Sequence, residues 1–309
     1  GGPFEIGGTT PLEVLRLAYS AAQIAHGRDD GVALYSLSSD EDHARRHALL
    51  TDFARALEAP DELRLVFQPR VELPNGRCVG VEALARWTHP ELGPISPGEF
   101  IPIIERSALA GPLTQWVFRS VFNHLALWRS ENAHFHVSVN VTASNLEDPQ
   151  FVDSIVQQLN RYALPAEAIE IEITEGTVMG NVPGAMRTLQ ALRSLGIRVA
   201  IDDFGTGYSS LSYLRRLPIS SVKIDQSFVR SMANDERDRK LVQSIIRMSH
   251  DLGYHVVAEG VETQEDAAHL IAMGCDEAQG YWFSRPLEAD QIIGWVRTHP
   301  TSSVALAAC

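Results

Sequence analysis

Eight short β-rich runs alternate with helical apolar patterns along the chain from Leu63 onward. Strands separated by helices predict parallel pairing in an α/β fold. Eight such units over about 250 residues favour a closed (β/α)8-type barrel, and an open doubly wound sheet is the alternative. The strand candidates are Arg64–Val71, Val79–Trp87, His136–Thr142, Ala168–Glu175, Arg198–Phe204, Ser221–Asp225, Tyr254–Val261 and Glu277–Trp282.

The ends of the intervening helices carry recognisable signals. Asp148-Pro149 is typical of an N-cap followed by a first-turn proline, and Thr263 with Asp266 predicts a capping box. Glycine stands at three predicted C′ positions, where a left-handed backbone is common: Gly196, Gly253 and Gly274. Each of these glycines is followed within a few residues by a strand that ends on a polar side chain, which supports repeated βα units.

Polar and aliphatic residues alternate within several strand candidates. Ser138 and Asn140 share one face and Val137 and Val139 the other, because successive side chains point to opposite sides of a strand. The aliphatic faces would meet the helices, so the polar faces would point into the barrel. The solvent face of an antiparallel sheet is the alternative, although helix-covered strands normally lack such alternation. The other polar sets are Glu170, Glu172 and Thr174; Lys223 and Asp225; and Glu82, Leu84 and Arg86.

Two adjacent carboxylates, Asp202 and Asp203, follow an apolar run and precede a glycine-bracketed turn. They are either ordinary turn residues or ligands of a divalent cation, which would relieve their mutual repulsion. The inward polar groups favour the second interpretation, because oxygen ligands suit Mg²⁺ or Mn²⁺ better than Zn²⁺. These groups are Glu82, Asn140, Glu172, Asp202, Asp203, Glu259, Lys223 and Gln279.

Composition narrows the class of protein. A net charge of −13 argues against a nucleic-acid polymer as partner, since such binding needs a basic face. No apolar run reaches the ~18 residues of a membrane span, so we expect no membrane contact in this segment. The scattered cysteines Cys78, Cys275 and Cys309 favour a reducing compartment, and we expect a cytoplasmic location.

Two reactions suit a barrel mouth lined with carboxylates. Phosphate-ester hydrolysis needs a very large rate enhancement, which a metal plus positioning can supply and acid–base residues alone cannot. Enolisation on Mg²⁺ is the alternative, with Lys223 as the base. Generic chemistry leaves both open.

Ordered motifs then resemble the EAL domain family over about Leu63 to Arg297. The family comprises bacterial phosphodiesterases that hydrolyse cyclic di-GMP to linear 5′-pGpG. The resemblance implies a modified TIM-type (β/α)8 barrel whose first strand runs antiparallel to the others. The matching segments are Phe67-Gln68-Pro69, Glu82–Arg86 (E-A-L-x-R), Asn140, Glu172–Glu175 (E-x-T-E), Asp202–Ser210 (D-D-F-G-T-G-Y-S-S), Lys223–Asp225, Glu259–Glu262 and Gln279–Tyr281.

The resemblance also implies roles for individual residues. First-cation ligands would be Glu82, Asn140, Glu172 and Asp202, with Asp202 bridging to a second ion beside Asp203. Glu259 would act as general base or second-ion ligand, and Lys223 would orient the attacking water or stabilise the phosphate. Glu175 would anchor the D-F-G-T-G loop. Substrate contacts would come from Gln68, Leu84, Arg86 and Gln279, with Asp225 and Glu262 in support.

The resemblance divides the chain into residues 1–57 and 58–309. The first part more weakly resembles the end of a GGDEF domain, degenerate here, plus a linker helix over Ala44–Leu57. It lacks the signature cyclase loop, so we expect no cyclase activity. Expected partners are cyclic di-GMP, a second copy in a homodimer, and an upstream GGDEF or sensor domain. The alternative function is a catalytically silent cyclic di-GMP receptor that acts through a protein partner.

Overall fold

The computed structural model describes residues 37–206, 214–233 and 235–298. The chain divides into two compact units, Gly1–Glu58 and Ala59–Cys309. The first unit contains helix α2 (Leu37–Ala56), which covers the predicted linker helix and begins seven residues earlier than expected. The rest of the segment that resembles a GGDEF domain, residues 1–36, lies outside the described residues.

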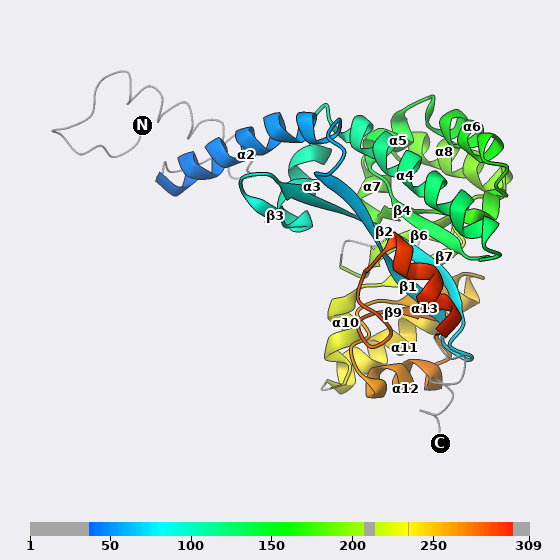
Figure 1. Cartoon of the computed structure of the whole chain (residues 1–309). Helices are drawn as coiled ribbons and strands as arrows, with labels where there is room; N and C mark the ends of the chain where they lie inside the picture. Colours follow the sequence, from blue (N-terminus) through cyan, green and yellow to red (C-terminus); the bar gives the residue numbers. More distant parts are fainter. Residues whose placement is uncertain (1–36, 207–213, 234, 299–309) are drawn as a thin grey trace, which may run out of the picture. The chain divides into compact units, whose positions relative to one another are not determined.

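The second unit contains the barrel (Figure 1). Its strands are β1 (Leu63–Glu72), β2 (Cys78–His89), β3 (Gly93–Ile95), β4 (His136–Asn140), β5 (Ile169–Thr174), β6 (Arg198–Phe204), β7 (Ser221–Ile224), β8 (His255–Ala258), β9 (Glu277–Gln279) and β10 (Leu287–Glu288). Its helices are α3 (Pro97–Glu105), α4 (Ala110–Ser130), α5 (Ala143–Glu147), α6 (Phe151–Arg161), α7 (Glu175–Met179), α8 (Val182–Ser194), α10 (Gln226–Ser231), α11 (Glu236–Asp251), α12 (Gln264–Ala272) and α13 (Ala289–Thr298), with a 3-10 turn at Ala166–Ala168.

The strands close into a ring, which excludes the open doubly wound sheet. Neighbours run in the order β1, β2, β4, β5, β6, β7, β8, β9, and β9 pairs back with β1. Pairing is parallel from β2 through β9, whereas β1 is antiparallel to both of its barrel neighbours. The prediction of a modified barrel with a reversed first strand is therefore confirmed. Strands β3 and β10, which pair at the edges, were not predicted.

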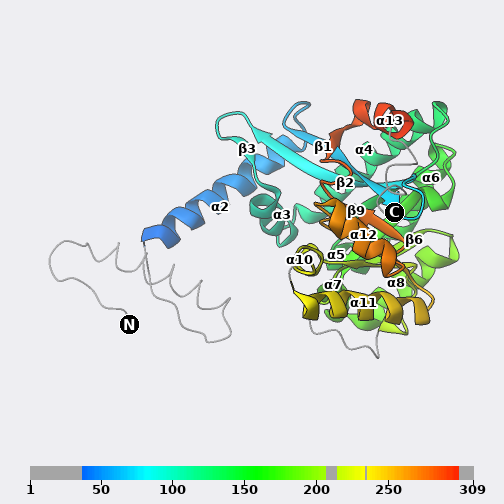
Figure 2. The ribbon, with the colours of Figure 1, turned by 90° about the horizontal axis from the view of Figure 1, so that it is seen from below.

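The β1–β2 ribbon is longer than the other strands and extends past the ring. Figures 1 and 2 show its far end, with β3 and α3, projecting to one side of the barrel. Within the ring, β1 is set against β2 so that Gln68 lies opposite Glu82 and Arg70 opposite Gly80. This register fixes the height at which the side chains of the reversed strand enter the barrel.

Both faces of the barrel strands are buried, but the outer face carries apolar side chains and the inner face polar ones. Val137 and Val139 pack outward in the apolar core under the helices, and Ser138 between them is also buried, on the inner face. Lys223 is likewise 0% exposed. The alternation predicted from the sequence thus marks a polar barrel interior. Solvent does not cover that face, so the antiparallel surface sheet was the wrong alternative.

Most helix-end predictions are confirmed. Thr263 and Asp266 form the capping box of α12, and Gly196, Gly253 and Gly274 have φ values of +85°, +81° and +78°. The prediction for Asp148-Pro149 was wrong, because α6 begins at Phe151. The Asp148 carboxylate instead accepts a hydrogen bond from the Gln150 N–H in the preceding turn.

Candidate active site

Lys223 stands at the centre of a buried cluster at the carboxyl ends of the strands. Its Nζ lies 2.6 Å from Glu259 Oε1, 2.8 Å from Glu172 Oε2 and 3.1 Å from Asp202 Oδ1. Glu82 Oε2 is farther away, at 3.8 Å. The contact with Glu172 is a hydrogen bond, and those with Glu259 and Asp202 are close ion pairs. We call these five residues the Lys223 cluster; their carboxylates come from four different strands or strand ends.

Amide side chains hold Glu82 from both sides. Asn140 Nδ2 donates to Glu82 Oε1 at 2.9 Å, and Gln279 Nε2 donates to Glu82 Oε2 at 2.6 Å. Gln279 Nε2 also lies 3.0 Å from Gln68 Oε1, and Gln68 in turn donates to the Ser284 carbonyl at 3.2 Å. The reversed strand β1 thereby joins the site through Gln68, whose contact with substrate stays a prediction.

The two aspartates differ in conformation. Asp203 has a left-handed backbone (φ +53°), and its N–H donates to Asp202 Oδ1 at 2.9 Å. The turn brings the following chain to Glu175, whose Oε1 accepts from the Gly205 N–H at 3.3 Å. Glu175 is the first residue of α7. The anchoring role of Glu175 stays a prediction, because the rest of the motif, from Gly207, lies outside the described residues.

Burial and mutual repulsion shift the pKa values of the carboxyl groups. Burial, with the nearby Asp202 and Glu82 carboxylates, raises the pKa of Glu259 to about 8 despite the opposing charge of Lys223. Burial and the charges of Asp202 and Asp225 raise the pKa of Asp203 to about 6. For Lys223, burial alone would lower the pKa. Its carboxylate neighbours outweigh burial and hold the Lys223 pKa well above the usual value.

The donor set fits hard divalent cations. Two groups of carboxylates, Glu82–Glu172–Asp202 and Asp202–Asp203–Glu259, each bring their oxygens within 4.8 Å of one another, and Asp202 belongs to both. Among the described residues, Glu172 Oε1 and Gln279 Oε1 are buried oxygens that accept no hydrogen bond. Buried acceptors without donors are costly, and a cation would satisfy them.

Other predicted site residues lie outside the cluster. In the described part of the chain, Leu84, Arg86 and Glu262 make no hydrogen bond or ion pair to it. Arg86 Nη1 donates to the Ala85 carbonyl, and Glu262 pairs with Arg230 at 2.5 Å on the surface. Asp225 is the N-cap of α10 and accepts from the Ser227 N–H at 3.0 Å.

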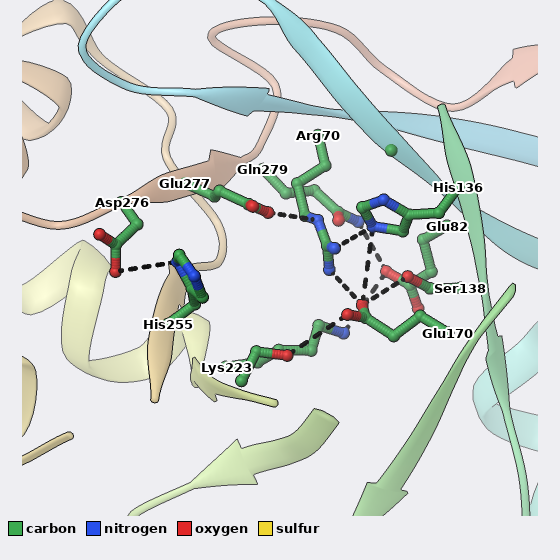
Figure 3. Close-up of polar contacts among 12 residues, drawn as sticks. Arg70, Glu82, His136, Ser138, Glu170, Lys223, His255, Asp276, Glu277 and Gln279 are labelled. Atoms are coloured by element: carbon green, nitrogen blue, oxygen red, sulfur yellow. Dashed lines mark hydrogen bonds and ion pairs between the residues drawn. The ribbon is translucent and has the colours of Figure 1, made fainter. Parts of the chain in front are cut away.

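A second set of polar residues, which the sequence reasoning missed, lies beneath the cluster. Figure 3 shows the Arg70 guanidinium between Glu277 on one side and Glu170 and His136 on the other. Arg70 lies two residues from Gln68, on the same face of β1, so the alternation rule could have found it. Glu170 was placed inside the barrel by its alternation with Ile169 and Ile171, but no function was inferred for it.

Taken together, the fold and the Lys223 cluster define a modified (β/α)8 barrel with a carboxylate-lined mouth. The sequence model of the EAL domain matches residues 51–286. The chain therefore belongs to the EAL domain family.

Three similar proteins illustrate this relationship. The cyclic di-GMP phosphodiesterase PA2567 of Pseudomonas aeruginosa is 42% identical over 283 residues, which are 92% of this chain and 48% of the relative. MucR of the same organism, a bifunctional diguanylate cyclase/cyclic di-GMP phosphodiesterase, is 37% identical over 279 residues, 89% of this chain and 41% of MucR. The solved PaMucR phosphodiesterase in complex with c-di-GMP is 39% identical, with a TM-score of 0.75, and the match covers 79% of this chain and 99% of that structure. The chain thus spans about half the length of the curated relatives it matches.

Proposed function

We propose that this chain hydrolyses cyclic di-GMP to linear 5′-pGpG with the help of Mg²⁺ or Mn²⁺. The observation that carries the proposal is the carboxylate cluster around Lys223, at the strand ends where barrel enzymes keep their active sites. The choice of cyclic di-GMP as substrate is supported by relatives named as cyclic di-GMP phosphodiesterases and by a related domain solved with c-di-GMP.

The net negative charge of the site supports the binding of two divalent cations. The carboxylates of Glu82, Glu172, Asp202, Asp203 and Glu259 outnumber the single ammonium of Lys223. Five negative charges against one positive charge leave −4, which two divalent ions would balance. We assign Glu82, Asn140, Glu172 and Asp202 to the first ion. Asp202, Asp203 and Glu259 would hold the second. Bound there, such ions supply Lewis-acid polarisation of a phosphoryl oxygen and acidify water.

The remaining roles follow from the contacts of the chain's own residues. Cations that bind the carboxylates would free N–H groups of Lys223 to donate to a phosphate oxygen or to orient the attacking water. Glu259, at the edge of the cluster, would accept the proton of that water when it is not itself a ligand. Gln68 and Gln279 would position the substrate, together with Leu84 and Arg86 beyond the cluster. Asp225 and Glu262 would support this arrangement.

The contacts of Lys223 with carboxylates suit a protonated cation better than the base of the enolising alternative. A general base must be deprotonated at the working pH, and the surrounding carboxylates hold the Lys223 pKa above its ordinary value. The same charge suits a phosphate-stabilising cation.

Wider assignments rest on the family and on the relatives. We propose that residues 1–57 are the end of a degenerate GGDEF-like domain with its linker helix, which agrees with the cyclase function named for MucR. We also propose a homodimer, an upstream GGDEF or sensor domain, and a cytoplasmic location. Among the described residues, every helix is too short or too polar to cross a bilayer.

The test is incubation of the chain with cyclic di-GMP and either metal, followed by chromatography of the products. Linear 5′-pGpG with Mg²⁺ or Mn²⁺, and none with a chelator, is the expected result. Tight cyclic di-GMP binding without product under both metals would identify the silent receptor instead. Absence of both binding and product would reject either function.

A further inference from the structure

Arg70 is a buried arginine beneath the Lys223 cluster. Its side chain is 3% exposed. Nε lies 2.8 Å from Glu277 Oε2, Nη1 lies 2.6 Å from Glu170 Oε1, and Nη2 contacts the imidazole of His136 (Figure 3). Nη1 and Nη2 are thus hydrogen-bonded, whereas Nε is within ion-pair distance of Glu277 but makes no hydrogen bond, and these contacts orient the planar guanidinium.

The same guanidinium reaches the candidate metal site. Glu170 and Glu172 share the inner face of β5, and Arg70 Nη1 lies 3.9 Å from Glu172 Oε1. The other oxygen of Glu172, Oε2, lies 2.8 Å from Lys223. The Glu172 carboxylate thus lies between two buried cations, hydrogen-bonded to Lys223 and within ion-pair distance of Arg70, which lies on the side away from the mouth.

Gly80 and His136 fix the position of the guanidinium from behind. Gly80 is the partner of Arg70 in the β1–β2 pairing. A Cβ at Gly80 would lie 2.4 Å from His136 Nε2 and 2.7 Å from His136 Cε1, so only glycine leaves room for the ring. The ring in turn is held by Arg198, whose Nη1 lies 3.1 Å from His136 Nδ1.

We propose that Arg70 is a positioning residue for the phosphodiesterase site, which helps to fix the orientation of Glu172 from below. The turnover part of this inference rests on the proposed function. Residues that orient a metal ligand typically matter about 10- to 100-fold for metal affinity or activity. Because Arg70 does not reach the mouth, its effect is expected in kcat and in metal affinity and not in KM for cyclic di-GMP.

A cavity makes this role testable by chemical rescue. About 640 Å³ of space opens at the amino-terminal ends of the strands, and its lining includes Arg70, Glu170 and Glu277. Exposed residues such as Arg77 also line it, so small solutes can enter from solvent. Arg70→Ala would leave a guanidinium-sized space between two carboxylates at the inner end of this cavity.

The experiment compares Arg70→Ala with the parent and with Arg77→Ala, an exposed arginine at the same cavity. Two readouts are used: kcat and KM for cyclic di-GMP, and calorimetric titration of Mn²⁺ without substrate. Arg70→Ala should lower kcat and Mn²⁺ affinity about 10- to 100-fold with little change in KM. Guanidinium ion at millimolar concentration should restore part of kcat, whereas urea, similar in shape but neutral, should not. Arg77→Ala should behave as the parent.

A double variant that removes both charges of the Arg70–Glu170 ion pair keeps the test decisive if Arg70→Ala unfolds. Arg70→Met with Glu170→Gln leaves no unpaired charge of this ion pair in the core, and circular dichroism reports whether it folds. A folded variant with parental kcat and parental Mn²⁺ affinity would overturn the role. If the parent itself shows no turnover, the proposed function fails, and the Mn²⁺ titration still decides whether Arg70 positions Glu172.

Discussion

The Lys223 ammonium lies 2.8 Å from Glu172 Oε2, and both side chains are completely buried. Glu172 lies on β5 and Lys223 on β7, two strands away across the mouth. Burial of a charged pair is costly unless further partners compensate it, and here Asp202 and Glu259 also contact the ammonium. The arrangement places more negative charge around Lys223 than one lysine can neutralise, and the first prediction follows from this excess.

Replacement of Lys223 should leave the repulsion among the surrounding carboxylates uncompensated. In Lys223→Met the four nearby carboxylates lose the one ammonium that contacts them among the described residues, and we expect the metal-free protein to lose about 3–5 kcal/mol of stability. Divalent cations should then raise the melting temperature of the variant more than that of the parent. Thermal unfolding with and without Mn²⁺ measures both effects. Lys240→Ala, at an exposed helical ion pair, is the control, and equal metal-induced shifts in all three proteins would contradict the prediction.

Glu82 tests the ligand assignment. Its two oxygens accept from Asn140 and Gln279, so Glu82→Gln keeps the shape of the side chain, removes the charge and retains one of the two acceptors. We expect both Glu82→Ala and Glu82→Gln to reduce turnover at least about 100-fold, because metal polarisation supplies several kcal/mol to the transition state. Steady-state hydrolysis of cyclic di-GMP measures the loss. Parental turnover in Glu82→Gln would show that hydrogen bonding, and not metal charge, is what the site needs from this residue.

Glu175 tests the connection between α7 and the aspartate turn. Its Oε1 accepts from the Gly205 N–H, so Glu175→Ala removes an acceptor and Glu175→Gln retains one. We expect Glu175→Ala to lower kcat about 10- to 100-fold and to raise the metal concentration needed for half-maximal rate. Glu175→Gln should keep most of the activity. Metal titrations of the initial rate measure both, and an unchanged Glu175→Ala would remove the anchoring role.

Metal affinity should depend on pH through Glu259. Burial first, and then Asp202 and Glu82, raise its pKa to about 8, so below that pH the carboxyl must release a proton before it can bind a cation. The apparent affinity for Mn²⁺ should therefore rise with pH, by up to about tenfold per unit, and level off above the pKa. Calorimetric titrations between about pH 6 and 9 in buffers of different ionisation enthalpy count the released protons. Glu259→Gln should flatten the profile, and a parental profile that is already flat would contradict the assignment.

Local pattern was enough to predict most elements and most of the cluster. Ser138, Asn140, Glu172 and Lys223 alternate with aliphatic residues, and the period of two in a strand places such residues on one face wherever the strand lies. The glycines after α8, α11 and α12 likewise mark helix ends by their own backbone preference. The exception was Asp148-Pro149, where the residues favour a turn as readily as a helix start, and the helix begins only at Phe151.

Amino-acid sequence by itself determined which residues alternate, which faces are polar and which acidic groups end the strands. Tertiary structure alone decided how far along the barrel axis each of these residues lies. Closure of the ring pairs Arg70 with Gly80 and Gln279, and this pairing places the Arg70 guanidinium 3.9 Å from Glu172. That placement depends on pairings between strands far apart in the chain and on the reversed direction of β1. Alternation along a single strand carries no information about either, because it fixes the face of a residue and not its neighbour across the barrel.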